Sequence, residues 1–257
     1  FAVHFHEFRS QFNYISAEEL MLQTQEAKFL VYCSNAVGEA LNTIGVKNKY
    51  LLYEAVDLAA IQPDHERTQQ LRKELGISPS AKVIVMSGSQ AEIKGIDIFV
   101  RVAEQLKSEP LHFLWLGSPV KSAFSWFWTE YAKKSAANIT FCHPAPADYY
   151  PGLALADLFF LSSRTDPFPL VMIEAAYLGK FIAGLDSGGV SEFVQDGCGV
   201  ILPTWNADEI AGRVRDLCAK LPAGWSPEKS TARAKQFDSK DLRGKFEQVM
   251  DAVFGNP

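Results

Sequence analysis

The 257-residue sequence has few cysteines, no excess of positive charge and no long apolar run. Its four cysteines, at positions 33, 142, 198 and 218, include no C-x-x-C pair, so neither a zinc site nor a disulfide framework is indicated. A net charge of -5 argues against a nucleic-acid partner. No segment approaches the ~20 apolar residues that span a bilayer. We expect a cytoplasmic protein, and peripheral contact with the inner face of a membrane stays open.

Several ligand-binding motifs are also missing. In GSQAEIKG the lysine precedes the glycine, whereas a P-loop needs Gly-Lys-Ser/Thr at the start of a helix. LDSGGVSEF lacks the G-x-G-x-x-G spacing of dinucleotide sites. No Asp-x-Asp pair or His/Cys cluster offers a cation site beside these loops. His4 and His6 share one face of the first strand, with Glu7 on the other, and are either a metal pair or partly buried strand histidines. We therefore expect no metal and no cofactor.

The chain instead contains strands and helices in regular alternation. Ser16 and Glu19 have the spacing of a capping box, which predicts a helix running to about Lys28. Strands that are nearly continuous apolar runs indicate burial on both faces, and helices between them indicate a parallel sheet. The fold class is therefore α/β, with a doubly wound, Rossmann-like parallel sheet and a partial second one. Strands are expected at 2–5, 29–33, 49–56, 81–88, 111–117, 138–143, 156–163 and 181–186, and helices at 35–43 (with Gly45 just beyond), 67–75, 96–106, 124–134, 170–179, 190–197 and 239–254.

Two carboxylates lie near the predicted end of the strand at 156–163. Glu174 interrupts the otherwise apolar helix PLVMIEAAYLG, and an unpaired buried carboxylate is costly, so it needs a dedicated partner. That partner is either the hydroxyl groups of a ligand or an internal salt bridge or loop amide. Asp166 lies eight residues earlier, and both can face one ligand site. Alternatively, Asp166 is a helix N-cap followed by Pro167.

Two further loops follow predicted strands, at the sheet edge where such folds bind ligands. Lys94 precedes Gly95 at the start of a helix, where the helix dipole disfavours a cation unless an anion is near. The alternative is a solvated lysine. Gly188 and Gly189 either let backbone amides approach a phosphate or form an ordinary tight turn.

The block SSRTDPFPLVMIEAAYLGKFIAGLDSGGVSEFVQDGCGV resembles the signature region of the family 4 retaining glycosyltransferases, whose E-x7-E motif here runs from Asp166 to Glu174. GSQAEIKGIDIF resembles the glycine-rich loop of that family with its Lys-Gly pair, and YLLYEAVDLAAIQP resembles its interdomain segment. The resemblance implies the GT-B fold, in which two Rossmann-like domains face a cleft. It also implies transfer of a sugar with retention, from a nucleoside-diphosphate sugar to a glycan or lipid-linked acceptor, without a metal.

The resemblance assigns catalytic-site roles to four residues. Glu174 would hold the ribose hydroxyls, Asp166 would contact the donor sugar, Lys94 would pair with the diphosphate, and His6, or its neighbour Glu7, would face the cleft from the N-terminal side. The donor contacts that it implies are Gly88, Ser89, Lys94, Gly95, His143, Asp166, Pro167, Phe168, Pro169, Leu170, Glu174, Gly188 and Gly189.

The resemblance also divides the chain. Residues 1–62 would be the end of an N-terminal acceptor-side domain with its linker, 63–238 the nucleotide-sugar-binding domain, and 239–257 a helix crossing back to the N-terminal side. Family members carry roughly 100 or more further residues upstream. We therefore expect a fragment that is inactive alone, with its acceptor side completed by a missing N-terminal half or by a partner chain.

Two residues depart from the family pattern. Ser89 stands where arginine is common, which removes a positive charge from the diphosphate site, and Asp166 is one methylene shorter than glutamate. The alternative to an enzyme is a non-catalytic module that binds a nucleotide-sugar, or only a partner protein. The base, the sugar and the acceptor are not specified by these motifs.

Overall fold

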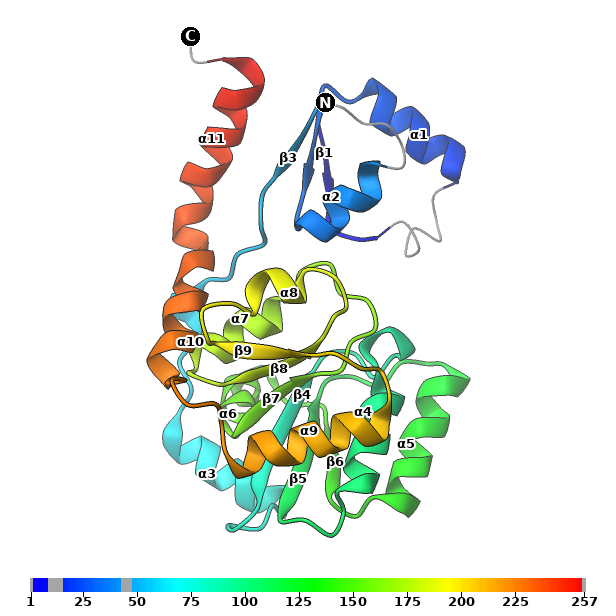
Figure 1. Cartoon of the computed structure of the whole chain (residues 1–257), viewed down its shortest axis with the longest axis vertical. Coiled ribbons are helices and arrows are strands. Elements are labelled where there is room, and N and C mark those ends of the chain that lie inside the picture. Colours follow the sequence, from blue (N-terminus) through cyan, green and yellow to red (C-terminus); the bar gives the residue numbers. More distant parts are fainter. Residues whose placement is uncertain (1, 9–15, 43–47, 256–257) are drawn as a thin grey trace.

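The computed structural model describes residues 2–8, 16–42 and 48–255, which form two parallel sheets one above the other (Figure 1). All their strand pairs are parallel, which confirms the predicted α/β class. The small sheet has the order β1-β2-β3, with β1 at Ala2–Phe5, β2 at Phe29–Tyr32 and β3 at Lys49–Leu51. The large sheet has the order β6-β5-β4-β7-β8-β9, formed by β4 (Lys82–Ser87), β5 (Leu111–Leu116), β6 (Ile139–Cys142), β7 (Leu158–Leu161), β8 (Ile182–Leu185) and β9 (Gly199–Leu202).

The order of the large sheet creates a crevice at its centre. The chain builds outward from β4 to β6, then crosses back to place β7 on the other side of β4, where Ile84 pairs with Leu158. Since right-handed crossovers put the helices of the two halves on opposite faces, the loops after β4 and β7 diverge. This switch point is where ligands of doubly wound sheets bind.

Helices cover both sheets. The apolar residues that recur at helical spacing along the predicted helix at 96–106 are all buried, which confirms its periodicity: Ile96, Phe99, Val100 and Ala103 of α4, and Leu106 at its C-cap. In β4 the four residues from Val83 to Met86 are fully buried, as expected of a strand covered on both faces. The helices are α1 (Ala17–Glu26), α2 (Asn35–Asn42), α3 (His65–Glu74), α4 (Ile96–Gln105), α5 (Ala123–Ser135), α6 (Tyr149–Ala154), α7 (Leu170–Tyr177), α8 (Val190–Phe193), α9 (Ala207–Ala219), α10 (Pro227–Ala234) and α11 (Leu242–Phe254).

The sequence predicts the start of α1 correctly and fails at several other elements. The capping box is confirmed, since Ser16 and Glu19 exchange hydrogen bonds of 2.9 and 3.1 Å. The strand predicted for 49–56 ends at Leu51, because Val56 leaves the sheet to bridge Asp238. No prediction covered α6, β9, α9 or α10. Gly45, expected just past α2, lies outside the described residues.

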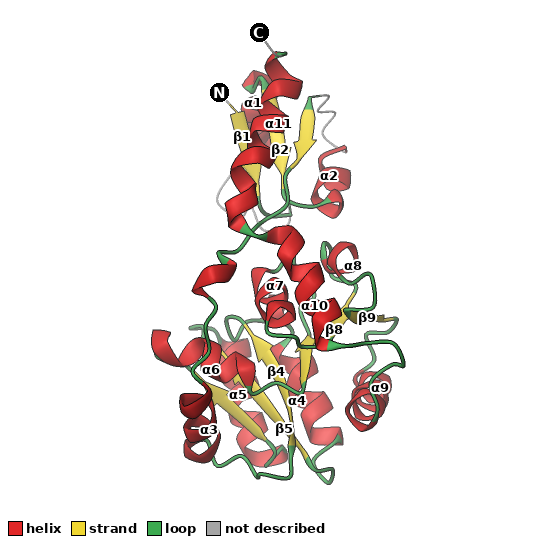
Figure 2. Ribbon diagram, turned by 90° about the vertical axis from the view of Figure 1, so that its left-hand side faces the viewer, coloured by secondary structure: helices red, strands yellow, loops and turns green. Residues whose placement is uncertain are grey.

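The C-terminal helix lies against the small sheet. α11 contributes Val249 to an apolar cluster with Phe29, Val31 and Leu52, and the rings of Phe254 and Phe29 lie 6.0 Å apart. Figure 2 shows α11 crossing in front of β1 and β2. A helix from the end of the chain thus covers one face of the N-terminal sheet. Within the described part of the chain, no helix has the length and apolar character to cross a bilayer.

Candidate functional site

A cleft of about 600 Å³ opens at the switch point, between the two sheets. Its floor comes from the loops after β4 and β7 and from the start of α7, and its opposite wall comes from residues that follow β1, β2 and β3. The described residues that line it are His6, Glu7, Cys33, Glu54, Ser87, Gly88, Lys94, Tyr149, Asp166, Pro167, Phe168, Pro169, Leu170, Val171 and Glu174.

Lys94 and Asp166 form an ion pair at the centre of this floor. The Lys94 Nζ lies 2.6 Å from Oδ2 of Asp166, to which the Ser163 hydroxyl also donates at 3.0 Å. Asp166 is buried, with 4% of its surface exposed. Neither simple alternative holds: Lys94 is not a solvated lysine, and Asp166 is not the N-cap of α7, a position that Pro169 occupies. A cation thus stands at the N-terminus of α4 because a buried carboxylate faces it.

Glu174 is held by two tyrosines. The Tyr149 hydroxyl donates to its Oε2 at 2.8 Å and the Tyr150 hydroxyl to its Oε1 at 3.4 Å. The internal partner is therefore neither a salt bridge nor a loop amide. Burial raises the pKa of Glu174, and the two phenol hydrogen bonds oppose that shift.

His6 and Glu7 reach the cleft from the small sheet. Because β1 ends at Phe5, strand alternation no longer separates them, and both line the same wall, contrary to the prediction that Glu7 faces away. The His6 Nδ1 is hydrogen-bonded to Glu54, and the His4 and His6 rings lie 3.8 Å apart. Partial burial raises the pKa of Glu7, an effect opposed by Lys94 and reinforced by Asp166.

A second hollow of about 380 Å³ adjoins the cleft and shares Ser87, Gly88 and Tyr149 with it. Ser89 and His143, both predicted donor contacts, line this hollow instead of the cleft. The His143 Nδ1 lies 3.0 Å from the Ser118 hydroxyl oxygen. The two hollows together form one continuous depression along the strand ends.

The loop that follows Asp166 forms one side of the cleft. Pro167, Pro169 and Leu170 line it, and Leu170 is 42% exposed. Phe168 anchors this loop, because its buried ring lies 4.9 Å from Tyr53 and 5.2 Å from Phe237. The predicted contact residues of this loop are therefore brought together on a fixed support.

Three predicted glycines allow close backbone packing. Gly95 has a φ of +70°, and a Cβ there would lie 1.9 Å from the carbonyl oxygen of Ser162. Gly189 donates its amide to the Asp166 carbonyl at 3.2 Å, and Gly188 forms a bridge with Asp166. Among the described residues, Gly188 and Gly189 support the loop from behind and are absent from the cleft lining, so their contact with a phosphate stays a prediction.

Three residues near the cleft escaped the sequence analysis. Tyr149 and Tyr150 belong to the unpredicted α6, although two adjacent tyrosines before an apolar run are a usable signal. Glu192 of α8 accepts the backbone amides of Asn35 and Ala36, at the start of α2, at 2.9 and 3.0 Å. Glu192 therefore joins the large sheet to the small one, and it lines a separate hollow with Tyr53 and Arg233.

The cleft holds one cation among several acidic side chains. Among the described lining residues Lys94 carries the one fixed positive charge, while Glu7, Glu54, Asp166 and Glu174 are acidic. Within the same described ranges, no group of three or more His, Cys, Asp or Glu side chains is placed to hold a metal ion. Cys33 lines the cleft, but burial raises its pKa to about 12, so its thiol is a poor nucleophile.

Known proteins share this sequence pattern and this fold. The chain is 27% identical over 176 residues to a glycogen synthase of Clostridium botulinum, and 31% identical over 179 residues to a D-inositol 3-phosphate glycosyltransferase of Jonesia denitrificans. These alignments cover 64% and 63% of the chain, which spans 36% and 41% of the length of those relatives. A structure of Anabaena HepE in complex with UDP superposes with a TM-score of 0.83 at 19% identity, covering 98% of this chain and 72% of that one.

The match to a family model is centred on the large sheet. The model for group 1 glycosyl transferases matches residues 81–220, more than half of the chain, from the start of β4 to the end of α9. This range contains Lys94, Asp166 and Glu174. The parallel sheets and the structural neighbours identify the fold as a GT-B arrangement. The chain belongs to the group 1 glycosyl transferases.

Proposed function

We propose that the cleft binds a nucleoside-diphosphate sugar and that the protein containing this chain transfers its sugar with retention. One observation carries the proposal: the Lys94–Asp166 pair of 2.6 Å stands at the switch point, beside the half-buried carboxylate of Glu174, which accepts hydrogen bonds from two tyrosine hydroxyl groups in the described part of the chain. A cation and a hydroxyl acceptor in one cleft match the two polar parts of a nucleotide, its diphosphate and its ribose.

In this proposal Lys94 pairs with the diphosphate. Its ammonium group lies at the N-terminus of α4, where the helix dipole adds to the positive potential. As the bond to the sugar breaks, negative charge grows on the departing diphosphate, and a fixed cation stabilises it without reorganisation. Because the chain supplies this charge itself, we propose that transfer needs no metal.

Glu174 accepts hydrogen bonds from the ribose hydroxyls in this arrangement, and the adjoining hollow beside Ser89 and His143 receives the base. Asp166, with the loop that follows it, contacts the sugar. His6 and Glu7 face the same sugar from the opposite wall. UDP is bound by the structural neighbour HepE, and it is accordingly the first nucleotide to test.

The acceptor and the division of the chain belong to the same proposal. We assign 1–62 to the acceptor side, 63–238 to donor binding and 239–257 to the helix that returns to the acceptor side. Transfer requires donor and acceptor in near-attack geometry. Since the chain spans less than half the length of these curated relatives, we expect it to bind donor without transferring sugar. The acceptor is a glycan or a lipid-linked molecule, and the cysteines favour a reducing compartment.

Calorimetry with UDP, ADP and GDP tests donor binding. We expect at least one of them to bind, and Glu174→Ala to weaken that binding at least tenfold, about 1.4 kcal/mol. Glu209→Ala, on the exposed first turn of α9, is the matched control and should bind as the wild type does. If none of the three binds the folded chain, the protein is an interaction module instead of a donor-binding one.

A further inference from the structure

Two adjacent tyrosines of α6 hold the two oxygens of one carboxylate. Tyr149 and Tyr150 follow each other in sequence, yet both phenols reach Glu174, at 2.8 Å to Oε2 and 3.4 Å to Oε1. A third hydroxyl, that of Ser87 at the end of β4, lies 3.1 Å from the Tyr149 oxygen. Each oxygen of the Glu174 carboxylate on α7 is thus held by a tyrosine of α6.

The hydrogen bonds in this chain of groups have a fixed direction. An ionised carboxylate only accepts, so the Tyr149 hydroxyl must donate to Glu174. Its single hydroxyl hydrogen is then used, so its oxygen accepts from the Ser87 hydroxyl. Burial and the neighbouring Glu174 raise the pKa of Tyr149, which keeps the phenol protonated as a donor. The direction runs from Ser87 through Tyr149 to Glu174.

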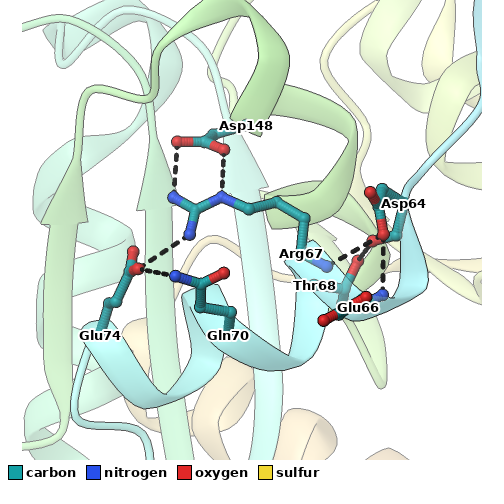
Figure 3. A network of polar contacts seen from close by, with 7 residues as sticks. All are labelled: Asp64, Glu66, Arg67, Thr68, Gln70, Glu74 and Asp148. Atoms are coloured by element: carbon teal, nitrogen blue, oxygen red, sulfur yellow. Dashed lines mark hydrogen bonds and ion pairs between the residues drawn. The ribbon is translucent and has the colours of Figure 1, made fainter.

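A network of ion pairs and hydrogen bonds between α3 and Asp148 fixes the start of the helix that carries the tyrosines. Asp148, the residue before Tyr149, receives both the Nε and the Nη2 of Arg67 on α3, at 2.6 and 2.9 Å (Figure 3). The same guanidinium donates to Glu74 at 2.8 Å, and this carboxylate also accepts from Gln70. A two-point pair of this kind sets orientation as well as distance. The start of α6 is therefore held in place relative to α3.

We propose that Tyr149 and Tyr150 are positioning residues that orient Glu174 for the two neighbouring hydroxyls of a ribose, and that Arg67 positions both tyrosines through Asp148. The proposal rests on the donor-binding function proposed above. A carboxylate offers about two acceptor sites on each oxygen. With one site on each oxygen used by a phenol, each oxygen keeps one for a ligand, which matches a pair of vicinal hydroxyls.

The test separates hydroxyl recognition from general affinity. Whichever of UDP, ADP and GDP binds most tightly is compared by calorimetry with its 2′,3′-dideoxy form. The readout is the dissociation constant of the dideoxy form divided by that of the parent nucleotide, which measures recognition of the two hydroxyls. Tyr149→Phe should lower this ratio about three- to tenfold, the equivalent of one ordinary hydrogen bond, because a less firmly oriented carboxylate holds the ribose hydroxyls less well. Affinity for the dideoxy form should change less than about twofold, because that ligand makes no use of Glu174.

Three variants complete the design. Tyr131→Phe is the matched control, since the Tyr131 hydroxyl on α5 also donates to a carboxylate, that of Glu104 on α4, and neither residue lines the cleft. The ratio for this variant should stay at the wild-type value. Arg67→Lys, which keeps the charge but not the two-point geometry, should lower the ratio in the same direction as Tyr149→Phe. Tyr150→Phe serves as the second test of the tyrosine pair should Tyr149→Phe not fold.

The outcomes distinguish the two proposals. A reduced ratio in Tyr149→Phe or Tyr150→Phe, with an unchanged ratio in Tyr131→Phe, supports the positioning role. If Glu174→Gln reduces the ratio while both tyrosine variants keep it, the positioning role is overturned and the function of Glu174 stands. If Glu174→Gln also keeps the ratio, the assignment of Glu174 to the ribose fails.

Discussion

The Glu192 carboxylate on α8 accepts the backbone N–H of Asn35, the first residue of α2, at 2.9 Å, across 157 positions of sequence. The other carboxylate oxygen, Oε1, accepts the amide of Ala36 at 3.0 Å. The Tyr53 hydroxyl donates at 2.8 Å to Oε2, the same oxygen that accepts from Asn35. The N-terminal amides of a helix lack partners within the helix, and a carboxylate satisfies both them and the helix dipole. One side chain of the large sheet thus caps a helix of the small sheet.

We predict that Glu192→Ala loosens this connection. Two backbone amides lose a charged acceptor, which should lower the free energy of unfolding by about 2 kcal/mol. Hydrogen exchange at Asn35 and Ala36 should become faster, while α9 keeps its protection. Glu247→Ala, which removes an exposed partner of Arg243 on α11, is the control and should change stability little. Unchanged exchange at the two amides of α2 would show that the cap contributes nothing.

Gly95 gives a prediction about the backbone of the site. Alanine there meets an unfavourable φ of +70° and the Ser162 carbonyl, so Gly95→Ala should destabilise the chain by more than about 2 kcal/mol. Gly212→Ala is a control of opposite sign. Gly212 lies within α9 with no atom within 4 Å of an added Cβ, and alanine should stabilise it by about 0.5–1 kcal/mol. Equal thermal stability of the two variants would contradict the close approach at Gly95.

The sequence alone indicated several of the residues that line the cleft, but it did not indicate which of them contact one another. Glu174 was visible because a carboxylate interrupts an apolar helix, and Lys94 because a cation precedes a helix. Their partners depend on strand order: Lys94 and Asp166 are 72 positions apart and meet because β7 returns to the side of β4. No local pattern encodes that return.

The missed elements have two different explanations. α6 has six residues, too few for a helical period to stand out, and its tyrosines therefore carried no structural prediction. α9, in contrast, was readable, because Ile210, Val214 and Cys218 recur every four residues and are all buried. Glu192 carried no prediction, since its partners come from the other end of the chain.

We predict that nucleoside binding weakens as the pH falls. Burial raises the pKa of Glu174, so the carboxylate protonates above the ordinary value of 4.5 and loses acceptor capacity. The stability of the ligand-free chain depends on pH in the opposite direction. The contribution of Glu174 to the free energy of unfolding is fully present below pH 4.5 and is lost as the pH rises through the raised pKa. A nucleoside without phosphate is the probe, because its own groups do not titrate there. Glu174→Gln should remove this pH dependence, and a slope that persists in this variant would assign the titration elsewhere.

We predict that donor binding survives removal of divalent cations. If Lys94 supplies the charge that the diphosphate needs, the dissociation constant measured in EDTA should stay within about twofold of that measured with added magnesium or manganese. A strict requirement for either ion contradicts the proposed role of Lys94.

The most direct prediction concerns Lys94 and Asp166 together. Lys94→Met keeps the length of the side chain and removes its charge, so binding of the nucleoside diphosphate should weaken at least tenfold, about 1.4 kcal/mol. Binding of the nucleoside alone should change less than about twofold, because it carries no phosphate. Lys133→Met, which breaks an exposed pair with Glu130, is the control.

Asp166→Asn tests the other half of the pair. In the wild-type chain the Lys94 ammonium lies 2.6 Å from Asp166, so this carboxylate competes with a ligand phosphate for it. Removal of the carboxylate charge should therefore keep or increase affinity for the nucleoside diphosphate, in contrast to Lys94→Met. Lys94→Met should also lower the free energy of unfolding by about 2 kcal/mol, between the values for exposed and buried pairs, since within the described ranges the Asp166 carboxylate then keeps the Ser163 hydroxyl alone as a side-chain donor. The double variant should regain part of that stability but none of the diphosphate affinity. Loss of diphosphate binding in Asp166→Asn equal to that in Lys94→Met would mean that the pair acts as a structural unit and that Lys94 does not contact the phosphates.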